Sequence, residues 1–208
     1  YIPYWTFDAA AYCPWTAESG TYYYITVRYR DSQGNSRTRR ERRIRWRPAS
    51  GIVNTHFDDI TVAGSNSIDS NLLRKIEPFP TEDLLPYETR YLSGWHVEQY
   101  RIDLPEAAKL SQAQMHSMLQ SMCGDQVPGD TYRHLKIFPE FSARTYKHIL
   151  VPLWIVAYRY RGKNFQSIVN GYTGKVAATY PKSAWKITLL TLLILALLSA
   201  IAYWIRNS

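Results

Sequence analysis

The residues that could carry acid–base or metal chemistry are few and scattered. His56 stands close to Asp58 and Asp59, and this is the one local grouping of titratable side chains with a catalytic look. Solvated carboxylates in a turn before a strand explain that grouping without catalysis. None of the five histidines pairs with another at a metal-ligand spacing, these being His56, His96, His116, His134 and His148. We therefore predict no catalytic residue and no metal ligand.

Motifs with an established chemistry are absent as well. The sequence has no His-Glu-x-x-His, no Cys-x-x-Cys, no EF-hand loop and no nucleophile elbow, and Gly162-Lys and Gly174-Lys lack the spacing of a phosphate loop. Two cysteines, Cys13 and Cys123, are too few for a disulfide scaffold or a four-ligand zinc site. We expect both cysteines to be buried thiols, and the alternative is a single disulfide bridge between them. The prediction is a protein that is not an enzyme and needs no cofactor, against the alternative of an enzyme whose site the spacing does not reveal.

The distinctive chemistry of the sequence is a concentration of arginine. Between Arg28 and Arg47 there are nine arginines and two acidic residues, which gives +7 of the formal net charge of +8. Alternating strand patterns on both sides of the turn cluster 31–36 predict a hairpin, with strands over 22–30 and 37–47. Alternate residues of a strand share a face. The predicted partner- or anion-binding residues are Arg39, Arg43, Arg45 and Arg47 on one face, with Arg28 and Arg30 alongside.

Several anionic partners would suit such a hairpin. A guanidinium binds carboxylate and phosphate groups through two parallel hydrogen bonds, so the candidates are acidic protein surfaces, anionic lipid headgroups and nucleic acid. Trp46 and the neighbouring tyrosines would allow base stacking, but motifs that read RNA or DNA are absent. The plain alternative is a solvated basic face that protects a sheet edge from aggregation.

The elements around the hairpin indicate an α+β fold, with an antiparallel β-rich soluble domain over residues 1–180. The 17 tyrosines and 7 tryptophans suit half-buried strand positions. One main helix is expected from Glu106 to Met122, opened by Pro105 and stopped by Gly124. A resemblance between Ile2-Pro-Tyr-Trp and Val151-Pro-Leu-Trp raises the option of two related β-units. Further predictions are a short helix over 70–76, strands over 57–63, 95–104, 132–139 and 143–160, and a hairpin over 165–180.

An uncharged apolar run predicts a C-terminal transmembrane helix over 187–205. Nineteen residues rising 1.5 Å each would cover about 28 Å, which is close to the thickness of the hydrocarbon layer. A linker over 181–186 would precede this helix and a tail over 206–208 would follow it. More basic residues precede the run than follow it, so we expect a tail-anchored, single-pass membrane protein with the bulk of the chain cytoplasmic. The predicted membrane-interface residues are Trp185, Lys186, Tyr203, Trp204 and Arg206.

Phrases spread over nearly the whole chain resemble one group of uncharacterised bacterial single-span membrane proteins. They include Tyr1-Ile-Pro-Tyr-Trp-Thr-Phe-Asp-Ala, Arg45-Trp-Arg-Pro-Ala-Ser-Gly, Tyr91-Leu-Ser-Gly-Trp and Val169-Asn-Gly-Tyr-Thr-Gly-Lys-Val. Members usually carry an N-terminal zinc ribbon and are often labelled primosomal-helicase-like. This sequence has neither ribbon cysteines nor helicase motifs, so zinc binding and helicase activity do not transfer. The resemblance implies a cytoplasmic domain on a membrane stem and, with a first residue that is Tyr, a piece of a longer protein.

Together these observations predict a membrane-anchored, non-enzymatic accessory or scaffold subunit. Its expected partners are an integral membrane protein complex and the lipid bilayer, which the arginine hairpin would contact. The alternative is a membrane-tethered nucleic-acid-binding protein.

Overall fold

The structure, a computed structural model, describes residues 1–30, 32, 34–181 and 184–207, with the backbone alone at 184, 187, 201–202 and 204–207. The described chain is α+β and rich in antiparallel strands. It divides into two compact units. The first comprises Tyr1–Ile68 with Pro80–Pro152, and the second comprises Asp69–Phe79 with Leu153–Ser208. Residues 182–183 of the predicted linker and residue 208 of the predicted tail lie outside the described residues.

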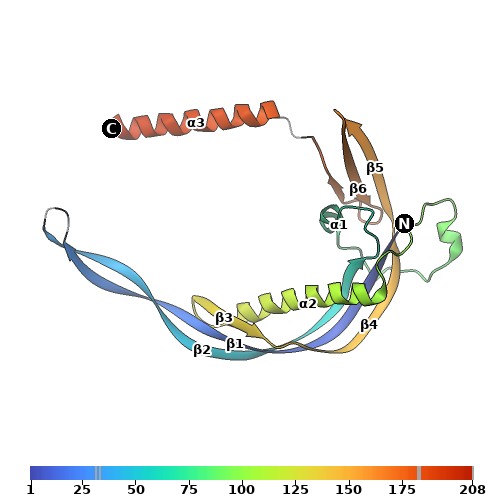
Figure 1. Ribbon diagram of the computed structural model, residues 1–208, viewed down its shortest axis with the longest axis horizontal. Coiled ribbons are helices and arrows are strands. Elements are labelled where there is room, and N and C mark those ends of the chain that lie inside the picture. The colour runs from blue at the N-terminus through green and yellow to red at the C-terminus, as the bar shows by residue number, and fades with distance from the viewer. Residues whose placement is uncertain (31, 33, 182–183, 208) are drawn as a thin grey trace. The chain divides into compact units, whose positions relative to one another are not determined.

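The first unit is built on one very long antiparallel hairpin (Figure 1). Strand β1 (Ile2–Arg30) has 29 residues and β2 (Ser36–Ala63) has 28. Strands β3 (Thr131–Ile137) and β4 (Glu140–Val151) follow one another along the opposite edge of β1, and each pairs antiparallel with it. As far as Gly20, therefore, β1 is a central strand with neighbours on both sides.

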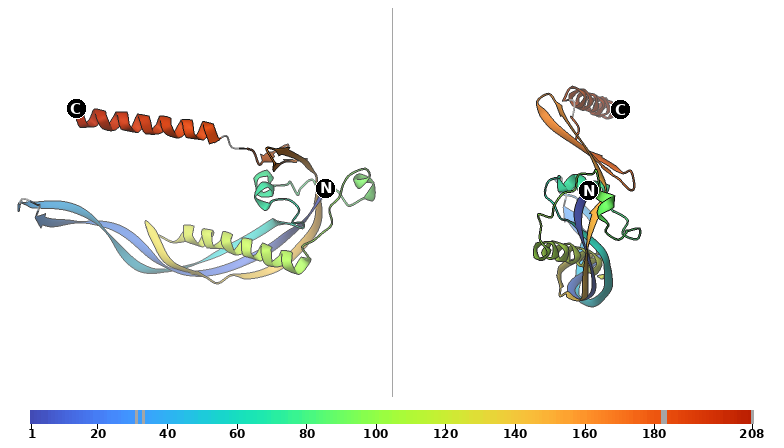
Figure 2. Two further views of the ribbon diagram at one scale, coloured as in Figure 1. Left: turned by 45° about the horizontal axis from the view of Figure 1, so that its top comes forward. Right: turned by 90° about the vertical axis from the view of Figure 1, so that its right-hand side faces the viewer.

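Helix α2 (Leu104–Gln126) lies along one face of this sheet (Figure 2). It begins where the Asp103 carboxylate accepts a hydrogen bond from the Glu106 backbone N–H, which satisfies a free donor of the first turn. Every fourth residue from position 107 to position 123 is buried, so the helix presents one narrow stripe to the sheet. That stripe consists of Ala107, Ser111, Met115, Leu119 and Cys123.

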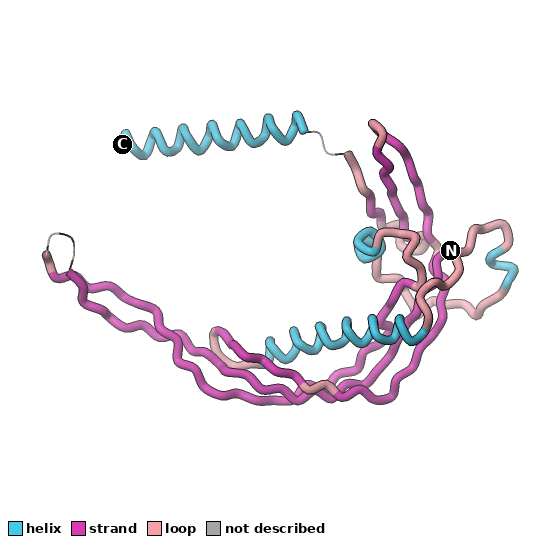
Figure 3. Tube along the Cα trace, viewed as in Figure 1, coloured by secondary structure: helices cyan, strands magenta, loops and turns pink. Residues whose placement is uncertain are grey.

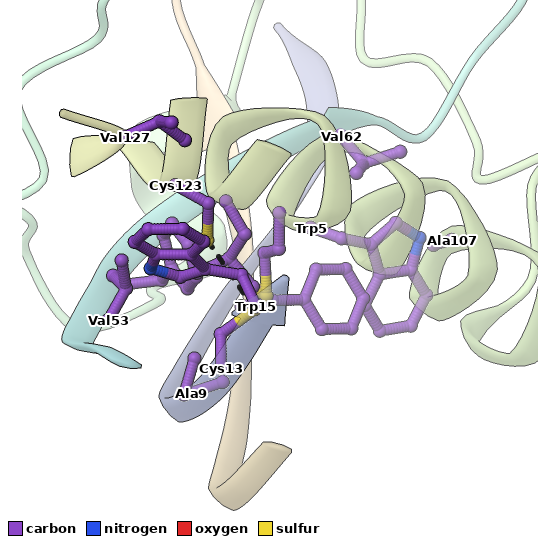
Figure 4. Close-up of a cluster of buried hydrophobic side chains, with 14 of the residues drawn as sticks. Trp5, Ala9, Cys13, Trp15, Val53, Val62, Ala107, Cys123 and Val127 are labelled. Atoms are coloured by element: carbon purple, nitrogen blue, oxygen red, sulfur yellow. Dashed lines mark hydrogen bonds between the residues drawn. The ribbon is translucent and has the colours of Figure 1, made fainter. Parts of the chain in front are cut away.

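The facing stripe of β1 follows the period of two that a strand requires. Figure 4 shows the two stripes interlocking around Trp5, Trp15 and the paired thiols Cys13 and Cys123. The residues of β1 in this core cluster alternate along the strand: Trp5, Phe7, Ala9, Ala11, Cys13, Trp15 and Ala17. From Ile2 to Phe7 the strand is buried on both faces. This alternation stops at residue 17, because α2 does not cover the strand beyond that point.

Trp15 is accommodated in this core by a glycine on the neighbouring strand. Gly51 lies directly opposite Trp15 in the β1–β2 register. A Cβ atom at Gly51 would approach the Trp15 ring to 2.5 Å, well inside van der Waals contact. The Trp15 indole N–H donates to the Gln126 side-chain oxygen at 3.4 Å, so the end of α2 fixes the ring that covers Gly51.

The second unit contains a small sheet in the order β5-β6-β7, with helix α1 (Ser70–Ile76) in the same unit. Its strands are β5 (Leu153–Tyr160), β6 (Lys163–Asn170) and β7 (Val176–Ala178). The buried Asn170 amide donates to the Ile76 carbonyl at 3.0 Å, which ties α1 to the sheet. Helix α3 (Ala184–Asn207) completes this unit, and a short 3-10 helix, η1 (Thr89–Leu92), belongs to the first.

The prediction of a transmembrane helix over 187–205 is wrong. No helix in the described part of the chain is long and apolar enough to cross a bilayer, which takes about 20 consecutive apolar residues. The tail-anchored, single-pass localisation that followed from this helix is wrong with it. Trp185, Lys186 and Tyr203 are exposed on α3, and the side chains of Trp204 and Arg206 lie outside the described residues.

Two predicted strands also differ from the structure. Residues 95–104 form no strand before α2 begins; their alternation arises because Tyr100 and Ile102 pack against the core of the first unit. The long strand predicted over 143–160 is divided at Pro152 into β4 and β5, which belong to different sheets. A proline cannot donate to a strand ladder, so it is a natural point of division.

Candidate functional site: an arginine-tyrosine arm

Beyond Gly20 the β1–β2 hairpin continues as a ribbon of two strands, seen beyond the end of β3 in Figure 3. We call residues 21–30 and 36–47 the arm. At about 3.3 Å per residue the ten residues from 21 to 30 reach roughly 30 Å. Most arm side chains are exposed, and all nine arginines are among them. Residues 31 and 33 are outside the described residues.

The strand register divides the arginines between the two faces of the arm, since residues directly opposite each other share a face. We name each face after one residue that it carries. The Glu41 face carries Arg37, Arg39, Arg43, Arg45 and Arg47, and the Trp46 face carries Arg28, Arg30, Arg40 and Arg42.

The predicted hairpin and part of its predicted surface agree with this register. Arg39, Arg43, Arg45 and Arg47 do share a face with Glu41. Arg28 and Arg30 are on the other face, because they pair with Thr38 and Ser36 rather than with positions of the Glu41 series. Strand periodicity alone could not fix this, because the face of the first strand depends on the length of the turn. Sequence reasoning missed Arg37, Arg40 and Arg42, which the register adds to the surface.

Tyrosine rings from β1 support the arginines of β2. Four guanidinium groups lie over rings on the opposite strand, at 4.4 to 5.8 Å from the ring centres. In each pair the arginine is diagonal to the tyrosine, which is a reach that long side chains make across a sheet. A stacked guanidinium keeps its N–H edge available for a carboxylate or phosphate. The pairs are Arg39 with Tyr29, Arg40 with Tyr24, Arg42 with Tyr22, and Arg45 with Tyr23.

Glu41 shows how the arm accommodates a carboxylate. Its side chain lies between the alternate arginines of β2, 2.9 Å from Arg43 and 3.6 Å from Arg39. These side chains are substantially exposed, so each ion pair adds little to stability. The arrangement nevertheless shows one carboxylate bound by two guanidinium groups of the same face.

A second cluster of charge surrounds the grouping that the sequence analysis set aside. The β1–β2 register shifts between Phe7 and Ala9, so β2 bulges there and Asp59 takes a positive φ of 51°. The bulge brings Asp8 beside Asp58 and Asp59, with carboxylate oxygens within 4.8 Å of one another.

The carboxylates of this acidic cluster already have partners within the chain, which include one cationic side chain. The Lys147 ammonium lies 3.1 Å from Asp59 and 3.9 Å from Asp8. Partial burial acts to raise the pKa of Asp8, but hydrogen bonds from the Asp59 backbone N–H and the Thr145 hydroxyl, with the Lys147 charge, lower it overall. The pKa of Lys147 is raised, chiefly by its hydrogen bond to Asp59. Three carboxylates could in principle hold a divalent cation, but here the Lys147 ammonium contacts two of them and offsets part of their charge.

The second unit has a hollow of about 600 Å³ between α1 and the sheet. Its carboxylate, Asp69, accepts a hydrogen bond from the Asn71 backbone N–H and so caps α1. Its aromatic wall is Tyr158 stacked on Phe165, with ring centres 5.5 Å apart. Another polar group of the lining has a structural partner too, since the Tyr158 hydroxyl donates to the Thr179 carbonyl at 3.4 Å.

Comparisons with known proteins leave the family of the chain open. No protein-family model matches it, and no solved structure matches it. The chain is similar to the uncharacterized protein YdjG of Bacillus subtilis (strain 168), with 28% identity over 142 residues. The match covers 65% of this chain and 40% of the relative, so the chain corresponds to less than half of that protein.

Proposed function

We propose that this chain is a non-enzymatic accessory or scaffold module, which docks onto an acidic protein partner through the Glu41 face of the arm. One observation carries the proposal: five arginines line one face of a projecting ribbon, and a carboxylate already lies between two of them. Arg45 and Arg47 continue the series on the same face, where an acidic side chain of a partner could contact their exposed guanidinium groups.

Folding alone gives no reason for such an arm. A two-stranded ribbon is marginally stable in water, and its like charges repel one another. Its cross-strand arginine–tyrosine contacts supply only about 0.2–1 kcal/mol each. A partner that neutralises the guanidinium groups would remove the repulsion and lower the free energy of the whole arm.

A second candidate function is nucleic-acid binding, and one observation favours it. Arginines occupy both faces of the arm and alternate with aromatic rings, including Trp46. The major groove of a duplex admits a two-stranded ribbon and has phosphates on both sides. A ligand of this kind would contact both faces, whereas an acidic protein surface would contact one.

The test compares two variants of equal charge. In the first, Arg39, Arg43, Arg45 and Arg47 on the Glu41 face are changed to Gln. In the second, Arg28, Arg30, Arg40 and Arg42 on the Trp46 face are changed to Gln. The probes are poly-L-glutamate and a 30-base-pair DNA duplex, with binding measured by fluorescence anisotropy at several salt concentrations.

The proposal expects poly-L-glutamate binding to weaken between about 30-fold and 700-fold in the Glu41-face variant, from four contacts of about 0.5–1 kcal/mol each. The Trp46-face variant should lose less than about tenfold. Because both variants lose four charges, a general charge effect would weaken both equally and would contradict a one-faced docking site. Tighter binding of the duplex, with equal losses in both variants, would establish the second candidate instead.

A further inference from the structure

Strand β5 forms an open edge of the sheet in the second unit, because among the described residues it pairs with β6 alone. Natural sheets protect such edges with short strands, charges or prolines. The other edge follows this rule, since β7 has three residues. Strand β5 has eight residues, and Arg159 is its single charged side chain. Its large exposed side chains are Trp154, Ile155, Val156, Tyr158 and Tyr160, of which Trp154 and Val156 are 57% and 56% exposed.

The turn after β5 identifies which backbone groups face the open edge. Arg161 and Gly162 form a two-residue turn with φ values of 51° and 76°, as a type I′ hairpin turn requires. The residues that flank such a turn, Tyr160 and Lys163, are a hydrogen-bonded pair. Because hydrogen-bonded and non-hydrogen-bonded pairs alternate along the ladder, even-numbered residues of β5 bond to β6. The N–H and C=O groups of Ile155, Ala157 and Arg159 therefore point to the open edge.

We propose that β5 pairs antiparallel with β5 of a second copy of this chain, around a two-fold axis through Ala157, to form a continuous six-stranded sheet. Residues whose N–H and C=O groups point to the open edge must pair with the corresponding residues of the second copy. This register then sets Ala157 opposite its own copy and Ile155 opposite Arg159 of the second copy. On the other face it sets Trp154 opposite Tyr160 and Val156 opposite Tyr158, which are the aromatic and β-branched pairs that stabilise antiparallel sheets.

Charge and symmetry favour a second copy over another occupant. Antiparallel pairing places the two Arg159 side chains four residue positions apart, or about 13 Å, beyond the screening length at 0.1 M salt. Parallel self-pairing would set the two arginines side by side. The exposed apolar residues of β5 need an equally apolar strand, and β5 itself is one. A two-fold contact of one patch with itself is the commonest way in which identical chains associate.

The test uses proline to remove one outward donor. Ala157→Pro deletes an N–H that faces the open edge and leaves the β5–β6 bonds in place, a position where strands tolerate proline. Sedimentation equilibrium of the full chain should give a dimer for the unchanged protein and a monomer for Ala157→Pro. Their melting temperatures should agree at protein concentrations low enough to dissociate the unchanged dimer. The matched control is Val156→Pro, which removes an inward donor and should lower the melting temperature.

A cysteine variant makes the result independent of proline. Ala157→Cys places two thiols on the two-fold axis, at a Cα separation of about 5.5 Å that permits a disulfide. Mild oxidation should convert it to a covalent dimer, whereas Ser142→Cys, on β4 of the other unit, should stay uncrosslinked. A monomeric unchanged protein at about 100 μM, or a dimer that persists in Ala157→Pro without crosslinking of Ala157→Cys, would overturn the proposal.

Discussion

Asp8 of β1 and Lys147 of β4 link the bulge of β2 to the next two strands of the sheet. The pKa of Asp8 is lowered in the folded chain, so its contribution to stability is present above the unfolded pKa of about 3.9 and is lost as the pH falls through the folded value. The pKa of Lys147 is raised, so its contribution is present below about pH 10.4 and is lost as the pH rises through the folded value.

As the pH is lowered, the free energy of unfolding of an Asp8→Asn variant should therefore fall less steeply than that of the unchanged chain. At pH 7 its free energy of unfolding should be lower than that of the unchanged chain, by about 1 kcal/mol or less because Lys147 is half exposed. The two proteins should converge once the pH falls below the lowered pKa of Asp8, since its carboxylate is then protonated in the folded chain as well. Thermal unfolding followed by circular dichroism from pH 2 to 8 measures this. Parallel curves over the whole range would contradict the linkage.

The two thiols are a second case in which single residues make a measurable prediction. Cys13 and Cys123 are buried with sulfur atoms 3.8 Å apart, and burial together with the Cys13 neighbour raises the pKa of Cys123 to about 12. A thiol reacts as its thiolate. Labelling with a disulfide reagent at pH 8 should thus be slow in the folded chain and fast in denaturant, with Ser142→Cys, at an exposed position of β4, as the control. Rapid labelling of the unchanged folded chain would show that the core opens there.

At the scale of the elements, the stability of the first unit depends on α2, whose buried residues pack against the sheet. Leu119 is fully buried in the stripe that meets β1. Leu119→Ala should cost about 2–5 kcal/mol by leaving a cavity, whereas Gln120→Ala, on the exposed face one residue further, should stay within about 0.5 kcal/mol of the unchanged chain. Urea unfolding of the two variants measures the difference. Equal midpoints would mean that α2 does not hold the sheet.

How much of each element could be predicted depended on whether its signal was local. The hairpin, α1 and α2 were predictable because periodicity, caps and turns lie within a few residues of each other. The continuity of β1 was not, because Pro14 and Gly20 look like breaks until a neighbouring strand is known on each side. Residues 95–104 show the opposite failure, since a core can bury alternate side chains of a segment that has no strand partner.

At the scale of the whole molecule, the sequence did not reveal the two units or their open edges. The second unit is interleaved with the first, since Asp69–Phe79 joins strands that come about eighty residues later. Such long-range pairing leaves no mark in a local pattern. The arm and the β5 edge belong to different units, so docking and self-association can be tested separately: the arginine variants should leave the dimer intact, and Ala157→Pro should leave poly-L-glutamate binding intact.

The central position of β1 also determines the order in which the chain can fold as it is made. One edge of β1 is paired as soon as β2 emerges from the ribosome, but Ile2 must wait for Val151 on the other. At about 5–20 residues per second, the roughly 90 residues between the end of β2 and the end of β4 take on the order of 5–20 s to synthesise. For that time the nascent chain presents an unpaired edge, and until α2 has emerged it also presents the bare tryptophan stripe. In this state chaperones would bind the chain and slow translation would favour aggregation.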